Sequence, residues 1–258
     1  MTVVIATPTM GSAQPRFCVS LATAIAEIVG SGRGFRYATV DNCYLSLARN
    51  YLMNLFLQTE GASHLLFIDS DMGVPEGVVE RLLEARLPLA GALYARRKLE
   101  KDLLRRAIAA GAAADEALAA ASNFVGEIAA PGSAGGEVRV VKGFVPVRYL
   151  GFGCVLIDRR VPEEMIRAGV VGPSDQSALG RMGLETPVYD FFTEIVREDG
   201  ERLGEDYSFC HRYAQLPEAR MAALVDVAVG HVGSFSYGGR YLDHIAARRA
   251  IRDRGKSQ

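Results

Sequence analysis

Two aspartates separated by one serine, Asp69 and Asp71, directly follow an apolar run at residues 65–68. In an extended chain the side chains of residues i and i+2 point to the same side, so both carboxylates can face one cation. Hard oxygen ligands suit Mg²⁺ or Mn²⁺ better than softer metals. Asp and Ser are also ordinary turn residues after a strand. The pair therefore predicts a metal site only if the fold brings it to an edge where ligands bind.

Three further groups have side chains that could take part in chemistry. Arg49 and Asn50 lie inside a predicted amphipathic helix, where an internal Asn is locally unfavourable and an Arg is usually a surface residue. Glu205 and Asp206 are adjacent carboxylates, which could deprotonate a hydroxyl or merely stabilise a helix N-terminus. His231 follows an apolar strand and could be a metal ligand or a core histidine.

The ends of the other predicted strands carry polar and basic residues. Thr7, Pro8 and Thr9 close the first predicted strand, and Asp41 closes the second. Each could contact a nucleotide or form a simple turn. Arg96 follows the fourth predicted strand, where its charge could neutralise a diphosphate or begin a solvated helix.

Strands and helices alternate along the first part of the chain. This alternation predicts an α/β fold with a mostly parallel sheet and helices on both faces. Ligands of such sheets bind beyond the carboxyl ends of the strands, which is where Asp69 and Asp71 fall. The predicted strands are 2–6, 35–40, 64–68 and 87–93, and the predicted helices are 15–29, 45–58 and 75–85.

The pattern changes after residue 98. An alanine-rich stretch predicts a helical insertion near residues 99–125, and a stretch rich in glycine and proline predicts a loop at 130–136. A hairpin turn is predicted at Lys142-Gly143. Beyond it the chain predicts further strands, two short helices and a basic C-terminal helix from Arg240. The later predicted strands are 138–141, 145–150, 154–157 and 222–229, with an extended segment at 188–196 and helices at 161–168 and 205–214.

The composition is that of a protein able to bury a core. The chain has 258 residues, of which 49% are hydrophobic and 23% charged, and its net charge is −1. The whole chain therefore has no electrostatic bias toward nucleic acid or an anionic membrane. We expect a cytoplasmic protein, because no signal peptide, spanning segment or paired cysteine spacing is evident. The basic tail leaves peripheral membrane contact open.

The ordered set of motifs resembles GT-A glycosyltransferases, in particular family 2-like nucleotide-diphospho-sugar transferases. The resemblance covers roughly residues 2–95 and 145–235. It rests on the R-N pair in 48–53, the DxD in 64–71, the E-D element in 204–210 and the histidine in 229–233. It implies one Rossmann-like GT-A domain over 1–258. Residues 1–98 would be the nucleotide-sugar half, 99–144 an insertion, and 145–258 the acceptor and catalytic half.

The same resemblance implies a role for each group. A metal-dependent transfer of sugar from a UDP- or GDP-sugar to an acceptor, most simply a hydroxyl, would use Mn²⁺ or Mg²⁺. The metal ligands would be Asp69, Asp71 and His231. Asp206 would be the catalytic base of an inverting reaction, with Glu205 in support. The nucleotide-sugar contacts would be Thr7, Pro8, Thr9, Asp41, Arg49, Asn50, Asp69, Ser70 and Arg96.

Other functions remain open at the level of sequence. Aspartate-nucleophile phosphohydrolases of the HAD type also place a DxD after an apolar strand, and Asp69-Ser70-Asp71-Met72-Gly73 partly fits their motif. A GT-A domain that binds nucleotide or glycan without turnover is a second alternative. A sugar nucleotidyltransferase fits less well, because its glycine-rich basic N-terminal loop is absent. The acceptor could be lipid, glycan, protein, a small molecule or nucleic acid.

Overall fold

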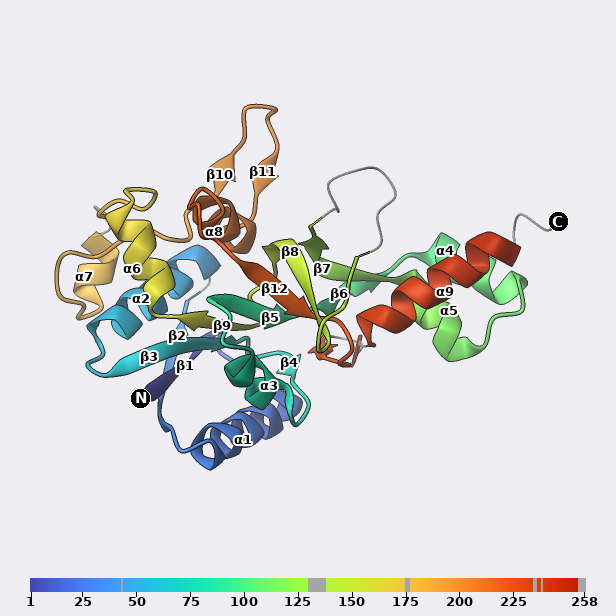
Figure 1. The fold of residues 1–258 in the computed structure, drawn as a ribbon, viewed down its shortest axis with the longest axis horizontal. Coiled ribbons are helices and arrows are strands. Elements are labelled where there is room, and N and C mark those ends of the chain that lie inside the picture. Colours follow the sequence, from blue (N-terminus) through green and yellow to red (C-terminus); the bar gives the residue numbers. More distant parts are fainter. Residues whose placement is uncertain (43, 130–137, 175–176, 234–235, 238, 255–258) are drawn as a thin grey trace.

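The computed structural model describes residues 1–42, 44–129, 138–174, 177–233, 236–237 and 239–254. Its centre is a nine-stranded sheet in the order β2-β1-β3-β9-β5-β12-β8-β7-β6 (Figure 1). The strands of this sheet are β1 (Thr2–Thr9), β2 (Gly34–Asp41), β3 (Ala62–Ile68), β5 (Leu89–Ala92), β6 (Tyr94–Leu99), β7 (Ser122–Ile128), β8 (Phe144–Leu150), β9 (Cys154–Asp158) and β12 (Met221–Leu224).

Helices and two small sheets complete the described chain. A three-stranded sheet has the order β14-β13-β4, and β10 pairs with β11. The helices are α1 (Pro15–Gly30), α2 (Leu45–Gln58), α3 (Val78–Ala85), α4 (Lys101–Ala109), α5 (Ala114–Ala121), α6 (Arg160–Arg167), α7 (Ser177–Arg181), α8 (Glu205–Tyr213) and α9 (Tyr241–Arg254). The short strands are β4 (Met72–Gly73), β10 (Ile195–Val196), β11 (Arg202–Leu203), β13 (Gly230–Val232) and β14 (Ser236–Tyr237).

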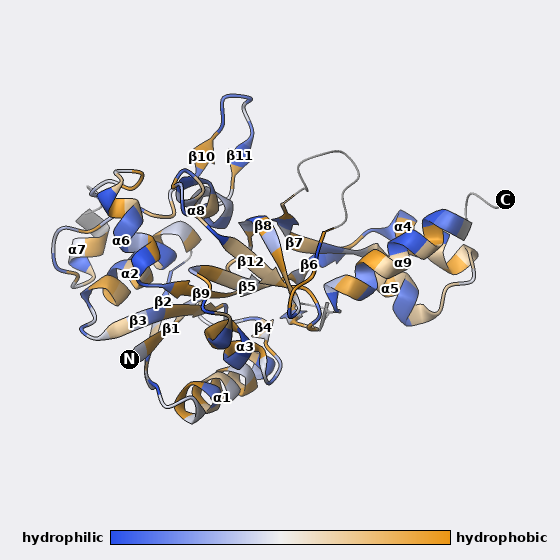
Figure 2. Ribbon diagram, viewed as in Figure 1, coloured by the Kyte–Doolittle hydropathy of each residue, from blue (hydrophilic) through white to orange (hydrophobic). Residues whose placement is uncertain are grey.

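Strand β1 shows why the sheet is covered on both faces. Its six central residues are all buried, because successive side chains point to opposite faces and each face has a helix layer. Val3 and Ile5 pack in the cluster that contains Phe17 of α1. Val4 packs in the other cluster, with Phe56 of α2. Figure 2 shows the central strands as predominantly hydrophobic, as strands buried on both faces must be.

Most of the central strands run in one direction. β1 is parallel to β2 and β3, and β5 is parallel to β12. β9 lies antiparallel between β3 and β5, so those two strands share a direction. β8 and β7 extend the sheet in antiparallel fashion toward β6. The predicted α/β fold, with a Rossmann-like central sheet that is mostly parallel in its core and flanked by helices, is confirmed.

The helical insertion lies to one side of the sheet, where α4, α5 and the C-terminal helix α9 lie together (Figure 1). His244 of α9 contacts α5, because its Nδ1 lies 2.8 Å from the carbonyl oxygen of Ala119. The predicted helix over 99–121 is interrupted between α4 and α5. β7, which follows α5, joins the main sheet, so the insertion also contributes a strand.

Two local predictions are wrong. Residues 7–9 do not form a loop, because β1 continues to Thr9 beside β2. Pro8 is compatible with this: the pairing of β1 with β3 ends at Ala6, so no donor is required from Pro8 on that side. Residues 138–141 do not form a strand, and only Val141 makes an isolated bridge, to Phe144. That bridge closes the predicted turn at Lys142-Gly143. The predicted loop at 130–136 lies outside the described residues.

Other elements are shorter than predicted. α3 begins at Val78 rather than at residue 75, and β12 ends at Leu224 rather than at residue 229. In the extended segment 188–196 only Ile195–Val196 form a strand. Among the described residues, no helix combines the length and the apolar character needed to cross a bilayer.

Candidate functional site

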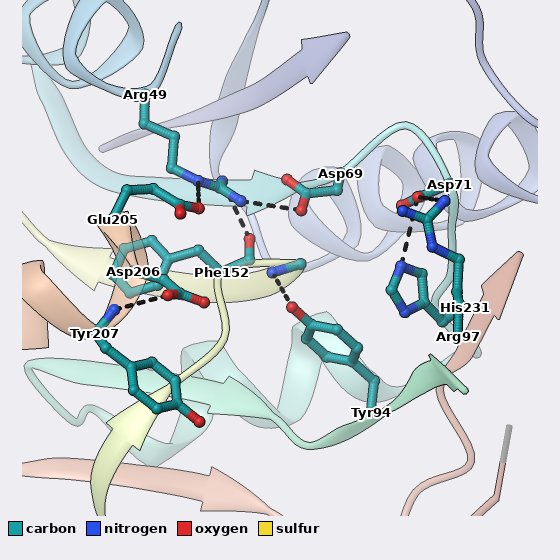
Figure 3. A network of polar contacts seen from close by, with 11 residues as sticks. Arg49, Asp69, Asp71, Tyr94, Arg97, Phe152, Glu205, Asp206, Tyr207 and His231 are labelled. Carbon is teal, nitrogen blue, oxygen red and sulfur yellow. Dashed lines mark hydrogen bonds and ion pairs between the residues drawn. The ribbon is translucent and has the colours of Figure 1, made fainter. Parts of the chain in front are cut away.

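The predicted acidic pair lies in a cavity of about 730 Å³ at the carboxyl ends of β1 and β3. Segments from distant parts of the chain form its walls: the loop after β1, the turn after β3, strand β6, the β11–α8 junction and β13. Figure 3 shows a network of polar contacts in this cavity, from Glu205 and Asp206 through Arg49 and Asp69 to Asp71 and His231. The lining residues that carry charge or a titratable ring are Arg49, Asp69, Asp71, Tyr94, Arg96, Arg97, Glu201, Arg202, Glu205, Asp206, Tyr207 and His231.

Arg49 joins the two halves of the site. It lies on α2 and is only 2% exposed. Its Nη2 donates to Oδ2 of Asp69 at 3.0 Å, and its Nε donates to Oε1 of Glu205 at 3.3 Å. The guanidinium also lies over the ring of Phe67, 5.2 Å from the centroid. Burial acts to lower the pKa of Arg49, but the charges of Asp69 and Glu205 outweigh this effect and the net shift is upward. The side chain is therefore a permanent cation.

Asp69 is held in place by backbone and side-chain contacts. Its N–H donates to the carbonyl of Gly153 at 3.1 Å, which continues the β3–β9 ladder past the end of β3. Its side chain is 22% exposed as a whole, but Oδ1 is buried and has no partner among the described residues. Burial raises the pKa of Asp69, and Arg49 opposes this shift. The carboxylate of Asp69 is thus committed to Arg49 through one oxygen.

Asp71 faces a histidine and an arginine. Its Oδ2 lies 3.4 Å from Nε2 of His231 and 3.0 Å from a terminal nitrogen of Arg97. The short β4–β13 ladder sets this geometry, because it pairs His231 with Met72, the residue after Asp71. Burial acts to raise the pKa of Asp71, but His231 and Arg97 outweigh it, so the net shift is downward. Asp71 is therefore an anion over the whole neutral range.

The contacts of His231 define what its ring can do. Nδ1 lies 3.0 Å from the carbonyl of Ala95, which can only accept, so Nδ1 carries a proton. In the neutral ring, the lone pair of Nε2 then points toward the carboxylate of Asp71. Two acceptors that face each other are stabilised by a proton or a cation between them. Imidazole plus carboxylate is a donor set that fits Mn²⁺ or Mg²⁺.

The three predicted metal ligands do not converge on one point. Asp71 and His231 come together, whereas Asp69 turns to Arg49. Within the ranges that the structure describes, no three His, Cys, Asp or Glu side chains could hold one ion. A divalent cation at Asp71 would thus take its remaining ligands from water or from a bound diphosphate.

Glu205 and Asp206 begin α8, and their side chains have different surroundings. Glu205 accepts the hydrogen bond from Arg49, and Oδ1 of Asp206 accepts the N–H of Tyr207 at 2.7 Å. Burial and the neighbouring charge of Glu205 raise the pKa of Asp206 to about 7. A carboxylate with that pKa can accept a proton at neutral pH, which is what a general base requires.

The remaining predicted contacts divide into two groups. Pro8, Thr9, Ser70 and Arg96 line the cavity. Thr7, Asp41 and Asn50 are not among its lining residues. Thr7 is fully buried, and its hydroxyl has no partner in the described chain. Asp41 is exposed at the end of β2.

Asn50 is occupied by another segment of the chain. Its Oδ1 accepts the backbone N–H groups of Phe191 and Phe192 at 2.8 and 3.0 Å, and its Nδ2 donates to Asp190 at 2.7 Å. These bonds explain why an Asn lies inside a helix: its side-chain amide supplies the hydrogen-bond acceptor that the buried N–H groups of Phe191 and Phe192 need. In this structure Asn50 positions the segment that packs behind the site.

Two residues of the site were not predicted from the sequence. Tyr94 is 5% exposed, accepts the N–H of Gly153 at 3.1 Å, and meets the ring of His231 edge-on at 5.3 Å. Arg97 contacts Asp71. A signal for Arg97 was present in the basic run Arg96-Arg97-Lys98, and both arginines of that run line the cavity. Tyr94 gave no such signal, because it ends an apolar run.

A second cavity, of about 1000 Å³, lies elsewhere on the molecule. Its lining is mainly apolar and includes Phe144, Val145 and Leu216. None of the predicted site residues lines it. Its charged lining residues are Arg81, Glu84, Arg139, Lys142 and Arg220, so it is mainly basic, and the predicted acidic residues lie in the smaller cavity.

Comparisons with known proteins show distant similarity in structure alone. No protein-family model and no curated protein sequence matches the chain. The crystal structure of A197 from STIV aligns with a TM-score of 0.48 and 15% identity, over 90% of this chain and 86% of that one. A glycosyltransferase involved in glycosylation of the major capsid of PBCV-1 aligns with a TM-score of 0.33 and 10% identity, over 66% and 65%.

A further alignment is with a Bacillus anthracis protein assigned as a glucose-1-phosphate thymidylyltransferase and crystallised with sucrose. Its TM-score is 0.38 and its identity 10%, over 98% of this chain and 96% of that one. At such identities and scores these similarities carry no inference about function. What the site can do follows from its own geometry.

Proposed function

We propose that the protein is a metal-assisted glycosyltransferase, which moves a sugar from a nucleoside-diphosphate sugar to an acceptor hydroxyl. One observation carries the proposal. Asp71, His231 and Arg97 form a cluster suited to an anion-bound cation, and the same cavity contains Asp206, a carboxyl with a pKa of about 7. Figure 3 shows the two groups on either side of the Arg49–Asp69 pair. A donor and an acceptor would need this separation.

The donor side would bind the diphosphate. Asp71 and His231 would hold Mn²⁺ or Mg²⁺, and such an ion stabilises negative charge on a leaving diphosphate. Arg96 and Arg97 both line the cavity and are exposed, so their guanidinium groups can reach phosphate oxygens. Pro8 and Thr9 border the same space and would contact the nucleoside.

The acceptor side would supply the base. The acceptor oxygen would attack the anomeric carbon while the bond from that carbon to the diphosphate oxygen breaks. The hydroxyl proton would pass to the carboxylate of Asp206, and the electron pair of the broken bond would leave with the diphosphate. Arg49 would hold the carboxyl groups of Asp69 and Glu205 in place without touching either substrate, so it is a positioning residue. A base on the face opposite the leaving group gives inversion.

The environment of Asp69 argues against an aspartate-nucleophile phosphohydrolase. A nucleophilic carboxylate must present a free oxygen to phosphorus. In Asp69 one oxygen is bonded to Arg49, and the other is buried without solvent access. Turnover of a generic phosphate monoester that is abolished by Asp69→Asn alone would favour the hydrolase.

A panel of UDP, GDP and their common sugars, each with and without Mn²⁺ or Mg²⁺, tests the proposal. We expect thermal stabilisation by one nucleoside diphosphate in the presence of metal, and slow release of free sugar from the matching donor because water replaces the acceptor. If no nucleoside diphosphate stabilises the protein and no donor is hydrolysed, the chain is not a nucleotide-sugar enzyme. Stabilisation without any donor turnover would instead indicate a binding domain.

A further inference from the structure

Strand β2 ends the sheet and is an unusually accessible edge. Its eight residues pair with β1 in an unbroken register, and among the described elements no strand pairs with its other side. Phe35 and Tyr37 are 42% and 38% exposed. Natural edge strands are normally protected by charge, proline, bulges or short length. β2 is long, regular and free of proline. Its charged residues are Asp41 at its end and Arg36, whose side chain lies on the face opposite to Phe35 and Tyr37 and donates to Thr59.

The opposite edge of the same sheet shows the expected protection. β6 carries three consecutive basic residues, Arg96, Arg97 and Lys98. Its pairing with β7 also shifts register between Ala95 and Leu99. A charged, irregular edge discourages pairing with another chain. The contrast indicates that β2 is left open for a partner.

The backbone of β2 shows which residues face outward. The N–H of Gly34 donates to the carbonyl of Met1, the residue before β1, at 3.1 Å. The N–H of Asn42 donates to the carbonyl of Thr9 at 3.1 Å. In a parallel ladder, the backbone N–H and C=O of one residue point to one neighbouring strand, and those of the next residue point to the opposite side. Even-numbered residues of β2 therefore point their N–H and C=O groups toward β1. The odd-numbered residues, which include Phe35, Tyr37 and Thr39, point theirs to the open edge.

This edge is complementary to itself in one antiparallel register. If Tyr37 lies opposite Tyr37 of a second copy, each outward N–H meets an outward C=O, and Phe35 lies opposite Thr39. The same register brings the side chain of Arg33, which precedes β2 and whose N–H donates to Ile28, toward Asp41 of the other copy, once at each end. Opposite charges across strands stabilise a pair, and Arg33–Asp41 is repeated by the two-fold symmetry.

We propose that the protein forms a homodimer in which the two β2 strands pair antiparallel about Tyr37, so that the two nine-stranded sheets become one. Asp41 belongs to this interface, which fits its exposed position outside the lining of the site cavity. The dimer would leave the cavity of each copy unchanged. The proposal does not depend on the reaction that the site performs.

Sedimentation velocity over roughly 1–100 μM tests the state of the native chain, and we expect a dimer. Tyr37→Lys places two like charges opposite each other and should shift the chain to monomer. Ile108→Lys is the matched control: it adds the same charge at an exposed apolar residue of α4, 60% exposed, in the helical group at the far end of the sheet from β2 (Figure 1), and should leave the dimer intact. A native monomer throughout this range, or a dimer insensitive to Tyr37→Lys, overturns the proposal.

Charge reversal tests the register. Arg33→Asp alone should weaken the dimer roughly tenfold, and Arg33→Asp combined with Asp41→Arg should restore it. A double variant as weak as the single one would overturn the register.

Disulfide trapping gives a second test that does not depend on a charge being tolerated. In a Cys18→Ser, Cys43→Ser background, Tyr37→Cys should form a dimer that reducing agent separates, because residue 37 faces itself at a spacing a disulfide can bridge. Phe35→Cys alone should not, because each copy faces Thr39. The background chain under the same oxidant is the control. Trapping through residue 35 but not through residue 37 overturns the register.

Discussion

Nε2 of His231 lies 3.4 Å from Oδ2 of Asp71, although the two residues come from opposite ends of the chain. The carbonyl of Ala95 fixes the ring from its other side, through Nδ1 at 3.0 Å. Neither residue alone would be a persuasive metal ligand. The orientation of the ring makes the pair a coordinated unit, because the lone pair of Nε2 and the carboxylate are directed at the same point.

The first prediction concerns this pair. His231→Ala and Asp71→Asn should each raise, by at least about tenfold, the metal concentration that is needed for a nucleoside diphosphate to stabilise the protein. Each change removes one of the two protein ligands of the metal. Thermal shift with titrated Mn²⁺ measures the effect. His64→Ala is the control, because His64 lies near the start of β3, away from Asp71, and its Nε2 is 4.0 Å from Oδ2 of Asp158. An equal loss in His64→Ala would show a general effect on stability.

A second prediction concerns the pH dependence of turnover. The pKa of Asp206 is raised to about 7, so its base form increases as pH rises through 7. We expect kcat/KM to fall about tenfold per pH unit below this pKa and to level above it. Asp206→Asn should lower turnover by roughly 10²–10⁴-fold and abolish this limb of the profile. An unchanged profile in Asp206→Asn would assign the base elsewhere.

Asp206 also gives a third prediction, about stability. Its pKa is higher in the folded chain than the ordinary value of 3.8, so between these values the folded state binds more protons than the unfolded state. The contribution of Asp206 to the free energy of unfolding therefore becomes less favourable as pH rises from about 4 to 7. Asp206→Asn should melt at a higher temperature than the native chain at pH 8, and the difference should shrink toward pH 4. Calorimetry at several pH values measures both; a difference independent of pH would contradict the shift.

A fourth prediction isolates the role of Arg49. Replacement by Met leaves Asp69 and Glu205 without their shared cation, and we expect the free energy of unfolding to fall by about 3–5 kcal/mol. Arg105→Met is the control, since Arg105 is 80% exposed in its pair with Asp102 and should change stability by about 0–1 kcal/mol. Urea unfolding compares the two. Equal effects would mean that the buried network contributes little to folding.

A fifth prediction separates structure from ligand binding at Asn50. Asn50→Ala leaves the N–H groups of Phe191 and Phe192 without an acceptor, which should lower the free energy of unfolding by about 2–4 kcal/mol. The affinity for nucleoside diphosphate, measured by calorimetry below the melting temperature, should change less than threefold. A large loss of affinity with unchanged stability would place the amide against the nucleotide.

The sequence could predict the acidic pair because local pattern determines it. An apolar run ending in Asp-Ser-Asp defines β3 and its carboxyl end, and β3 ends at Ile68 as predicted. Helix α2 likewise runs from Leu45 to Gln58 as predicted. These features depend on residues close together in the chain.

Long-range geometry was beyond the reach of the sequence. The apolar run at 154–157 predicts a strand, but the antiparallel position of β9 between β3 and β5 depends on pairing partners far away in the chain. For the same reason the sequence could group Asp69 with Asp71 by spacing, yet could not show that Arg49 engages one and Arg97 the other. Which partner a charged side chain takes is a property of the assembled sheet.

The position of β9 has a consequence for synthesis of the chain on the ribosome. β3 and β5 are neighbours only through β9, so the first half of the sheet cannot close when β5 emerges. Roughly sixty more residues must follow Ala92 before Cys154 is made, which takes several seconds at about 5–20 residues per second. During that interval two apolar strand edges remain open on the nascent chain. A pause or truncation before β9 would thus expose them, and we expect chaperone binding to be strongest at this length.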